Sequence, residues 1–180
     1  MTPEVFVTTI LKPGEAWCEA VPGWHVPFDD RARVLLTAIA GQESAWLARI
    51  QAGPVAAAHS HFQMERMGGV HGVLHHPATA ALAKAACAAA NVPAYETLVW
   101  GIMATPAGDN LSVAFARLLL WSDPHFLPPV GNEDAGWIYY VRNWRPGAVA
   151  AGGDRAAKAR ERWATVYSQT MAAILPEKKA

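Results

Sequence analysis

Glu43 is the residue whose surroundings in the sequence point most directly to chemistry. The segment 31–51 places apolar side chains at the 3.6-residue spacing of an amphipathic helix. These apolar positions are Leu35, Leu36, Ile39, Trp46, Leu47 and Ile50. Glu43 falls inside this stripe, between Ile39 and Trp46, and not on the polar face. Because burial disfavours the charged form of a carboxyl group, the spacing predicts a raised pKa for Glu43.

A carboxyl group with a raised pKa is suited to general acid catalysis near neutral pH. Cleavage of a glycosidic bond uses such an acid to protonate the leaving oxygen. A buried structural carboxylate, paired with Arg117 or Arg142, would produce the same pattern. The periodicity alone leaves these two interpretations of Glu43 open.

Helices are the elements expected to position Glu43, and no segment has the pattern of a convincing strand. Asp29 or Asp30 is expected to cap the first helix, and Gly53-Pro54 to end it. The segment 109–121 is expected to be the most buried, because apolar residues cover most of it. The expected helices, about six in number, cover residues 31–51, 77–90, 94–103, 109–121, 133–144 and 154–174.

The whole chain, 1–180, is interpreted as one mainly α-helical domain. A Gly- and His-rich loop at 58–76 is expected to replace or contain a minimal β element. Residues 148–153 are predicted to form a flexible linker to the final helix, 154–174.

The composition favours a folded globule, because 52% of the residues are hydrophobic and 17% are charged. Lys and Arg total 15, as do Asp and Glu, so no basic excess favours nucleic acid. No secretion signal and no membrane span are predicted. Cys87 is expected to be a small buried hydrophobe. The cations are scattered apart from the Lys178-Lys179 tail and a small cluster of Arg155, Lys158, Arg160 and Arg162.

The run Gly41-Gln42-Glu43-Ser44-Ala45-Trp46 resembles the Glu-Ser signature of the lysozyme-like superfamily, which includes soluble lytic transglycosylases and goose-type lysozymes. In those families a helix ends near the Glu-Ser pair, and a segment with an apolar-Gln-apolar core follows. Phe62-Gln63-Met64 fits that core. The chain also resembles small bacteriophage-encoded proteins of lysozyme-like type. The matching stretches are 38–46, 53–54, 62–65, 68–79, 114–124 and 137–147.

The resemblance implies a role for several of these residues. Glu43 would be the catalytic acid, and Ser44 would orient Glu43 or the substrate. Phe62 and Gln63 would lie at the cleft, with Gln63 hydrogen-bonding a sugar. The family's late cleft tyrosine would be Tyr139 or Tyr140, and we prefer Tyr140.

One position departs from the family pattern. Ser60-His61 stands where the family usually has a glycine before the apolar-Gln core. Glycine at such a place allows positive φ and a close approach of the backbone to a sugar.

Glu65 is the candidate for a second catalytic carboxylate, and a solvated loop glutamate is the alternative. Without a second carboxylate, the resemblance implies a transglycosylase reaction with a 1,6-anhydro product. Trp144 is either a sugar-stacking residue or part of the core. Arg145 is either a partner for a peptide-stem carboxylate or a surface charge.

Five of the seven histidines lie between positions 59 and 76. Their His-x-His and His-x3-His-His spacings would suit a metal, but no cysteine or nearby acidic signature accompanies them. We therefore expect a solvated loop, no metal and no cofactor. A metal-dependent hydrolase built on this loop is a distant alternative.

Taken with the resemblance, these features predict a phage-derived enzyme that cleaves the MurNAc-GlcNAc strands of peptidoglycan with Glu43 as general acid. It would remain in the host cytoplasm after synthesis, or be carried in the virion and act in the periplasm. The alternative is a virion or tail protein, with a lysozyme-like fold, that binds cell wall or other virion proteins and has little or no activity.

Overall fold

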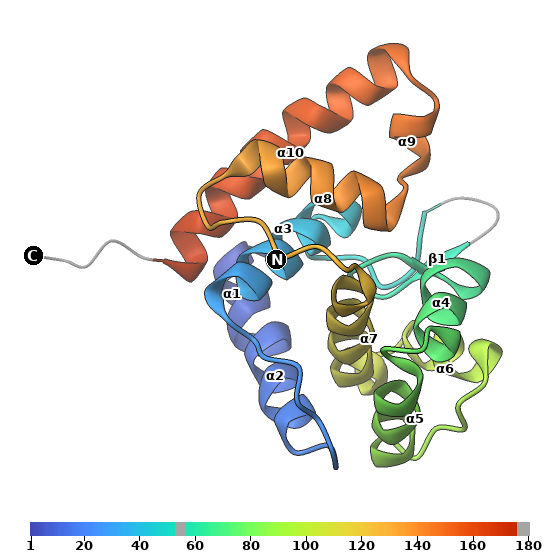
Figure 1. Ribbon diagram of the computed structural model, residues 1–180. Helices are drawn as coiled ribbons and strands as arrows, with labels where there is room; N and C mark the ends of the chain where they lie inside the picture. The colour runs from blue at the N-terminus through green and yellow to red at the C-terminus, as the bar shows by residue number, and fades with distance from the viewer. Residues whose placement is uncertain (53–56, 176–180) are drawn as a thin grey trace, which may run out of the picture.

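The computed structural model describes residues 1–52 and 57–175 and is mainly helical (Figure 1). One two-stranded antiparallel ribbon pairs β1 (Ala58–His59) with β2 (Met64–Glu65). The helices are α1 (Pro3–Phe6), α2 (Lys12–Glu19), α3 (Asp30–Ser44), α4 (His71–His75), α5 (Ala80–Ala89), α6 (Glu96–Ile102), α7 (Asp109–Ser122), α8 (Glu133–Trp144), α9 (Gly147–Ala150) and α10 (Gly153–Ile174).

The helix α7 occupies the centre of the larger part of the fold, with α2, α4 and α5 packed around it. Most of its residues are buried, as predicted, although Trp121 at its end is partly exposed. On the other side of α3, α8 and α10 run side by side (Figure 1). Helix α3 therefore lies between the α7 group and the α8–α10 pair.

The helical N-terminal segment was not predicted. Helix α1, a π-helical turn at Val7–Leu11 and α2 follow one another without a break. Pro13 and Gly14 suggest an interruption in the sequence, yet both lie in the first turn of α2, where proline is tolerated. Gly14 packs so closely on α7 that a Cβ there would lie 2.7 Å from Val113.

Helix α3 begins where predicted but ends earlier. The Asp29 side chain caps its start by accepting a hydrogen bond from the Ala32 amide. The helix ends at Ser44, because Ala45 and Trp46 adopt left-handed backbone conformations. This reversal folds Trp46 back over the helix, where its Nε1 donates to the Thr37 carbonyl at 2.9 Å.

The early end of α3 corrects part of the predicted apolar stripe. Leu47 and Ile50 lie beyond the helix and are 60% and 49% exposed, whereas Trp46 is buried. The expected stop at Gly53-Pro54 lies outside the described residues. Gly41 permits the reversal, because a Cβ there would lie 2.4 Å from the Trp46 ring.

The segment expected to be a Gly- and His-rich loop is largely ordered into elements. It contains the predicted minimal β element, then a π-helical turn at Arg66–Val70, and then α4. His59 and His61 are buried, so the prediction of a solvated histidine loop is wrong for these two residues.

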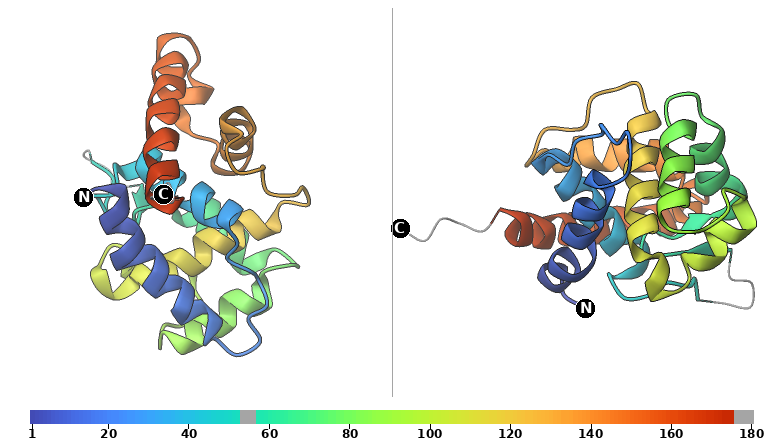
Figure 2. Two further views of the ribbon diagram at one scale, coloured as in Figure 1. Left: turned by 90° about the vertical axis from the view of Figure 1, so that its left-hand side faces the viewer. Right: turned by 90° about the horizontal axis from the view of Figure 1, so that it is seen from below.

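The final helix belongs to the body of the fold. Helix α10 packs along α3, and α1 lies beside its C-terminal part (Figure 2). The predicted linker 148–153 is occupied mostly by the short helix α9 and by Gly152 and Gly153, both at positive φ. Both cysteines, Cys18 and Cys87, are free and buried.

Within the described residues, none of the helices combines the length and apolar character needed to cross a membrane.

Candidate functional site

A cleft of about 920 Å³ opens beside the C-terminal end of α3. One wall comes from α8 and α10, and the opposite wall from β2, the Arg66–Val70 turn and Gly72 of α4. Glu43, Gln63, Glu65, Tyr140 and Trp144 all line it. The structure thus brings together five of the residues selected from the sequence, although they lie up to 101 positions apart in the chain.

Glu43 is half-buried at the cleft, in the last turn of α3. Burial raises the pKa of its carboxyl group to about 7, and the negative charge of Glu65 acts in the same direction. A hydrogen bond from Tyr140 and the charge of Arg162 oppose this rise but do not cancel it. The carboxyl group therefore keeps its proton to near neutral pH.

The structural alternatives for Glu43 are not realised. Arg142 pairs instead with Asp123 on the other side of α8, at 2.7 Å. Arg117 is buried and donates its Nε to the Pro27 carbonyl. Glu43 therefore forms an ion pair with neither arginine.

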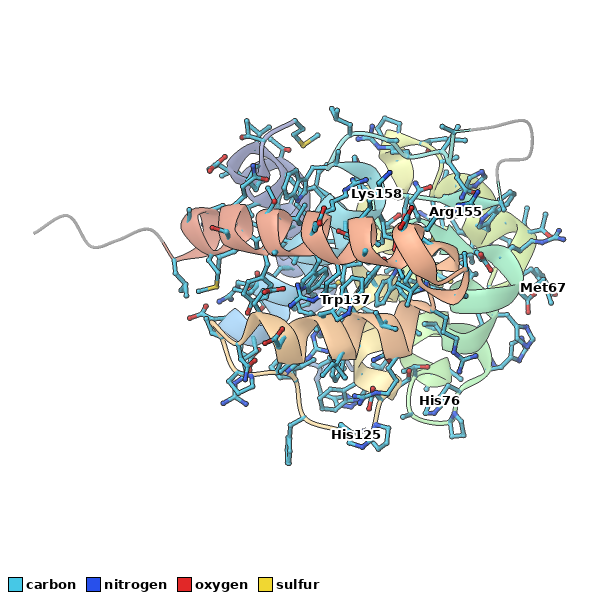
Figure 3. The ribbon with its side chains drawn as sticks, turned by 90° about the horizontal axis from the view of Figure 1, so that it is seen from above. Met67, His76, His125, Trp137, Arg155 and Lys158 are labelled. Atoms are coloured by element: carbon cyan, nitrogen blue, oxygen red, sulfur yellow. The ribbon has the colours of Figure 1, made fainter. Side chains whose placement is uncertain are left out.

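Tyr140 is the cleft tyrosine. Its hydroxyl donates to Oε1 of Glu43 at 2.5 Å, whereas the hydroxyl of Tyr139 donates to the Leu120 carbonyl inside the core. Burial raises the pKa of the Tyr140 phenol, so it remains a hydrogen-bond donor. The Tyr140 ring stacks on Trp163 with centroids 4.9 Å apart, and Trp137 packs against both between α8 and α10 (Figure 3).

Two side-chain contacts attach the end of α3 to α10 just before the acid. Gln42 donates its Nε2 to the Ala159 carbonyl at 3.1 Å. Arg162 donates its Nη2 to the Gly41 carbonyl at 2.8 Å. The backbone that carries Glu43 is therefore fixed against the wall of the cleft.

The turn between β1 and β2 places Gln63 at the cleft. Ser60 and Gln63 both have positive φ, at 70° and 48°. Gln63 donates its Nε2 to the Ser60 carbonyl at 2.7 Å, an internal bond that holds the turn. Ser60 therefore adopts the left-handed backbone conformation that glycine favours.

Trp144 joins this turn to α8. Its Nε1 donates to the Phe62 carbonyl at 2.8 Å, while its half-buried ring lines the cleft. Trp144 thus packs on the core and also reaches the cleft, where stacking on a sugar stays a prediction. Arg145, the next residue, is exposed and lines the cleft as well.

Two predicted substrate contacts are not supported by the structure. Phe62 is fully buried, and its ring packs edge-on against Phe6. Its side chain points into the core, while its backbone carbonyl faces α8. Ser44 does not line the cleft, and its hydroxyl donates to the Ala40 carbonyl one turn back.

The small cation cluster of the sequence supplies a row of cations along the cleft, a place that was not predicted for it. Arg155, Lys158 and Arg162 line it from α10, and Arg155 and Lys158 extend from the edge of α10 opposite α8 (Figure 3). Their spacing of three and four residues places them on one helical face. Arg160, the fourth member of the cluster, instead pairs with Glu133 and Asp134.

The histidines divide into two environments. His61 is buried against Phe6, and burial lowers the pKa of its ring to about 4. His59 stacks on Trp100 at 3.5 Å. In the part of the chain that the structure describes, the group of ligand-type side chains close enough to hold a metal is His71, His75 and Glu96, outside the cleft lining.

Comparison with known proteins finds no matching family model, no matching curated protein and no matching solved structure.

Proposed function

We propose that this protein cleaves the glycan strands of peptidoglycan, with Glu43 as the general acid. The observation that carries the proposal is a carboxyl group at the edge of a large cleft whose pKa is raised to about 7. A glycosidic oxygen is a poor leaving group until it is protonated, and such a carboxyl supplies that proton near neutral pH.

Tyr140 supports this role by fixing the carboxyl group. Its hydroxyl occupies one oxygen of Glu43, so the proton is left on the other oxygen for transfer. The stack on Trp163 and the bonds from Gln42 and Arg162 hold the pair in place. A general acid needs such fixed geometry as much as it needs the right pKa.

Glu65 is the proposed second carboxylate. It lies on β2 across the cleft from α8 and α10, and its charge acts on Glu43. As an exposed carboxylate it would stabilise the oxocarbenium-like transition state or activate water. Hydrolysis through Glu65 yields reducing ends, whereas a reaction with Glu43 alone yields 1,6-anhydro ends.

The cations of the cleft suit the charge of this substrate. Arg145, Arg155, Lys158 and Arg162 outnumber the two carboxylates that line the same space. The peptide stems of peptidoglycan carry carboxylates, and a cationic wall would attract them. The combination of an acid with a cationic wall supports peptidoglycan over an uncharged glycan.

The proposed relationship to the lysozyme-like superfamily rests on the Glu-Ser and apolar-Gln-apolar segments. Two features of the fold agree with that resemblance: a helix that ends at Ser44, and a turn in which Gln63 faces the acid's cleft. Ser60-His61 stands where the family usually has a glycine, a residue that allows positive φ. Ser60 nevertheless has a positive φ.

The decisive experiment measures release of soluble fragments from purified sacculi by the wild type, Glu43→Gln and the control Glu161→Gln, with product ends read by mass spectrometry. Glu161 is exposed on α10 outside the cleft lining. We expect Glu43→Gln to lose at least about a hundredfold in rate and the control to lose nothing.

A wild type that binds sacculi but releases no fragments between pH 5 and pH 8, roughly the range in which the acid is expected to work, would overturn the enzymatic proposal. That result would favour the alternative role as a cell-wall-binding or virion structural protein.

A further inference from the structure

Three side chains that can ligate a metal converge beside the α4 wall of the cleft. His71 and His75 lie one turn apart on α4, and Glu96 is the first residue of α6. Nδ1 of His71 and Nε2 of His75 each lie 2.8 Å from the same oxygen, Oε1 of Glu96. The three ligand atoms all lie within 4.8 Å of one another.

This arrangement is close to what a tetrahedral zinc ion requires. With zinc–ligand bonds of about 2.0–2.1 Å, neighbouring ligand atoms lie about 3.3 Å apart. Small side-chain rotations would therefore make room for an ion at the centre of the three atoms. Two imidazoles and one carboxylate form a common zinc ligand set that leaves the fourth position to water.

The surroundings of the three residues allow an ion to enter. The side chains of His71, His75 and Glu96 are 44%, 60% and 25% exposed, so an ion reaches them from solvent. The two rings lie with centroids 4.3 Å apart, and both present a nitrogen to Glu96.

We propose that His71, His75 and Glu96 bind one Zn²⁺ ion, with water as the fourth ligand, and that the ion joins α4 to α6. Gly72, between the two histidines, lines the cleft. The ion would therefore stiffen the wall opposite α8 and α10. The proposal gives the ion this joining role and assigns it no part in the chemistry of Glu43.

The test uses the full chain, freed of metal with a chelator, and zinc chloride as the only added ligand. Calorimetric titration is carried out on the wild type, His75→Ala, Glu96→Gln and the control His76→Ala. His76 is an exposed histidine of the same segment whose ring accepts a hydrogen bond from the Ala78 amide (Figure 3). We expect one ion per chain, at least about tenfold weaker binding in the first two variants, and no change in the control.

Two further measurements make the result independent of any variant's folding. Co²⁺ added to the metal-free wild type should give the visible absorption of a four-coordinate ion. Zinc should also raise the Tm of the wild type, because it binds only the folded chain. Glu43→Gln should bind zinc as the wild type does, whatever its activity.

No saturable zinc binding by the wild type would overturn the proposal, as would equal affinity in Glu96→Gln and the wild type. Loss of binding in His76→Ala equal to that in His75→Ala would also overturn it, because it would indicate nonspecific binding by surface histidines.

Discussion

The hydroxyl of Tyr140 donates to Oε1 of Glu43 at 2.5 Å, joining α8 to the last turn of α3 across 97 residues of sequence. The bond favours the ionised carboxyl group, whereas burial favours the protonated one, and burial has the larger effect. Glu43 therefore titrates near neutral pH under opposing influences, of which the Tyr140 hydrogen bond and the charge of Glu65 can each be removed by substitution.

The first prediction concerns the pH dependence of activity. A general acid must be protonated, so the rate should fall on the alkaline side with an apparent pKa of about 7. Tyr140→Phe removes an influence that lowers the pKa, so its alkaline limb should move to higher pH. Glu65→Gln removes an influence that raises the pKa, so its limb should move to lower pH. Initial rates on sacculi from pH 5 to 9, roughly two units either side of neutral, measure these shifts.

A purely structural role for Tyr140 would reduce the rate without moving the limb. Shifts of the same sign in both variants would contradict the assigned electrostatics of Glu43.

The second prediction concerns stability. Because the folded pKa of Glu43 is raised, the folded state holds the proton more tightly than the unfolded chain between the ordinary pKa of 4.5 and about 7. The stability that this proton provides is complete below pH 4.5 and is lost as the pH rises through 7. Glu43→Gln removes this loss, so its stability relative to the wild type should increase by about 3 kcal/mol between pH 4 and pH 8.

Urea unfolding of Glu43→Gln and the wild type at the two pH values measures that difference. Glu161→Gln, which replaces an exposed glutamate outside the cleft lining, serves as the control. If the stabilities of Glu43→Gln and the wild type differed by the same amount at both pH values, Glu43 would not be buried as described.

The third prediction tests the close approach of Trp46 to α3. An alanine Cβ at position 41 would lie 2.4 Å from the Trp46 ring and 2.6 Å from Val166. Gly41→Ala should therefore destabilise the protein by about 1–3 kcal/mol, or more if the reversal at Ala45 is lost. In α6, a Cβ at Gly101 would meet nothing within 4 Å, so Gly101→Ala should stabilise by about 0.5–1 kcal/mol.

Thermal and urea unfolding of the two alanine variants distinguish the expected loss of stability in Gly41→Ala from the expected gain in Gly101→Ala. Similar effects of the two substitutions would contradict the packing of Trp46 on Gly41.

The fourth prediction concerns the turn that places Gln63. Ser60 is buried at φ 70°, a conformation that glycine adopts without strain. Its hydroxyl accepts a hydrogen bond from the Phe62 amide at 3.2 Å, which glycine would lose. These effects oppose each other, so Ser60→Gly should change stability by less than about 1 kcal/mol.

Ser60→Val should be destabilising by about 2 kcal/mol or more, because a β-branched residue is strained at positive φ. Unfolding measurements on both variants provide the comparison. A well-tolerated valine would show that the turn is not held in this conformation.

The fifth prediction concerns the cations of the cleft. Charge reversal in the double variant Arg155→Glu/Lys158→Glu should weaken binding to sacculi, most strongly at low salt, because long-range attraction is screened as ionic strength rises. Lys84→Glu, on the exposed side of α5 away from the cleft lining, is the control. Pelleting assays over a salt series measure the effect, and equal loss in the control would contradict a localised cationic wall.

The elements that were predicted well are those with strong periodicity and clear ends. Residues 133–144 form a helix with the predicted bounds, and the last helix begins one residue early at Gly153. Asp29 caps α3 as its position indicates. By contrast, periodicity extended α3 to residue 51, because Trp46, Leu47 and Ile50 continue its spacing. The left-handed turn at Ala45 depends on Trp46 packing over Gly41, a tertiary contact that spacing does not reveal.

The candidate site also divides into features that the local sequence predicts and features that depend on tertiary contacts. The position of Glu43 within an apolar stripe is a local property, and its half-buried place at the cleft agrees with it. The choice between Tyr139 and Tyr140 requires knowing which face of α8 meets α3, and only the fold supplies that. The ligand set proposed for zinc could not be assembled from the sequence for a similar reason. No acidic residue lies close to the histidines in the helix that carries them, and Glu96 comes from another helix.

Helix α8 contacts the site at two points one turn apart. Tyr140 donates to Glu43, and Trp144 donates to the carbonyl of Phe62 in the turn that carries Gln63. The length of α8 between these two residues therefore sets the spacing between the acid and the opposite side of the cleft. One residue inserted between them would rotate one contact about 100° away from the other. Chains that keep this site should thus keep the number of residues between these two positions.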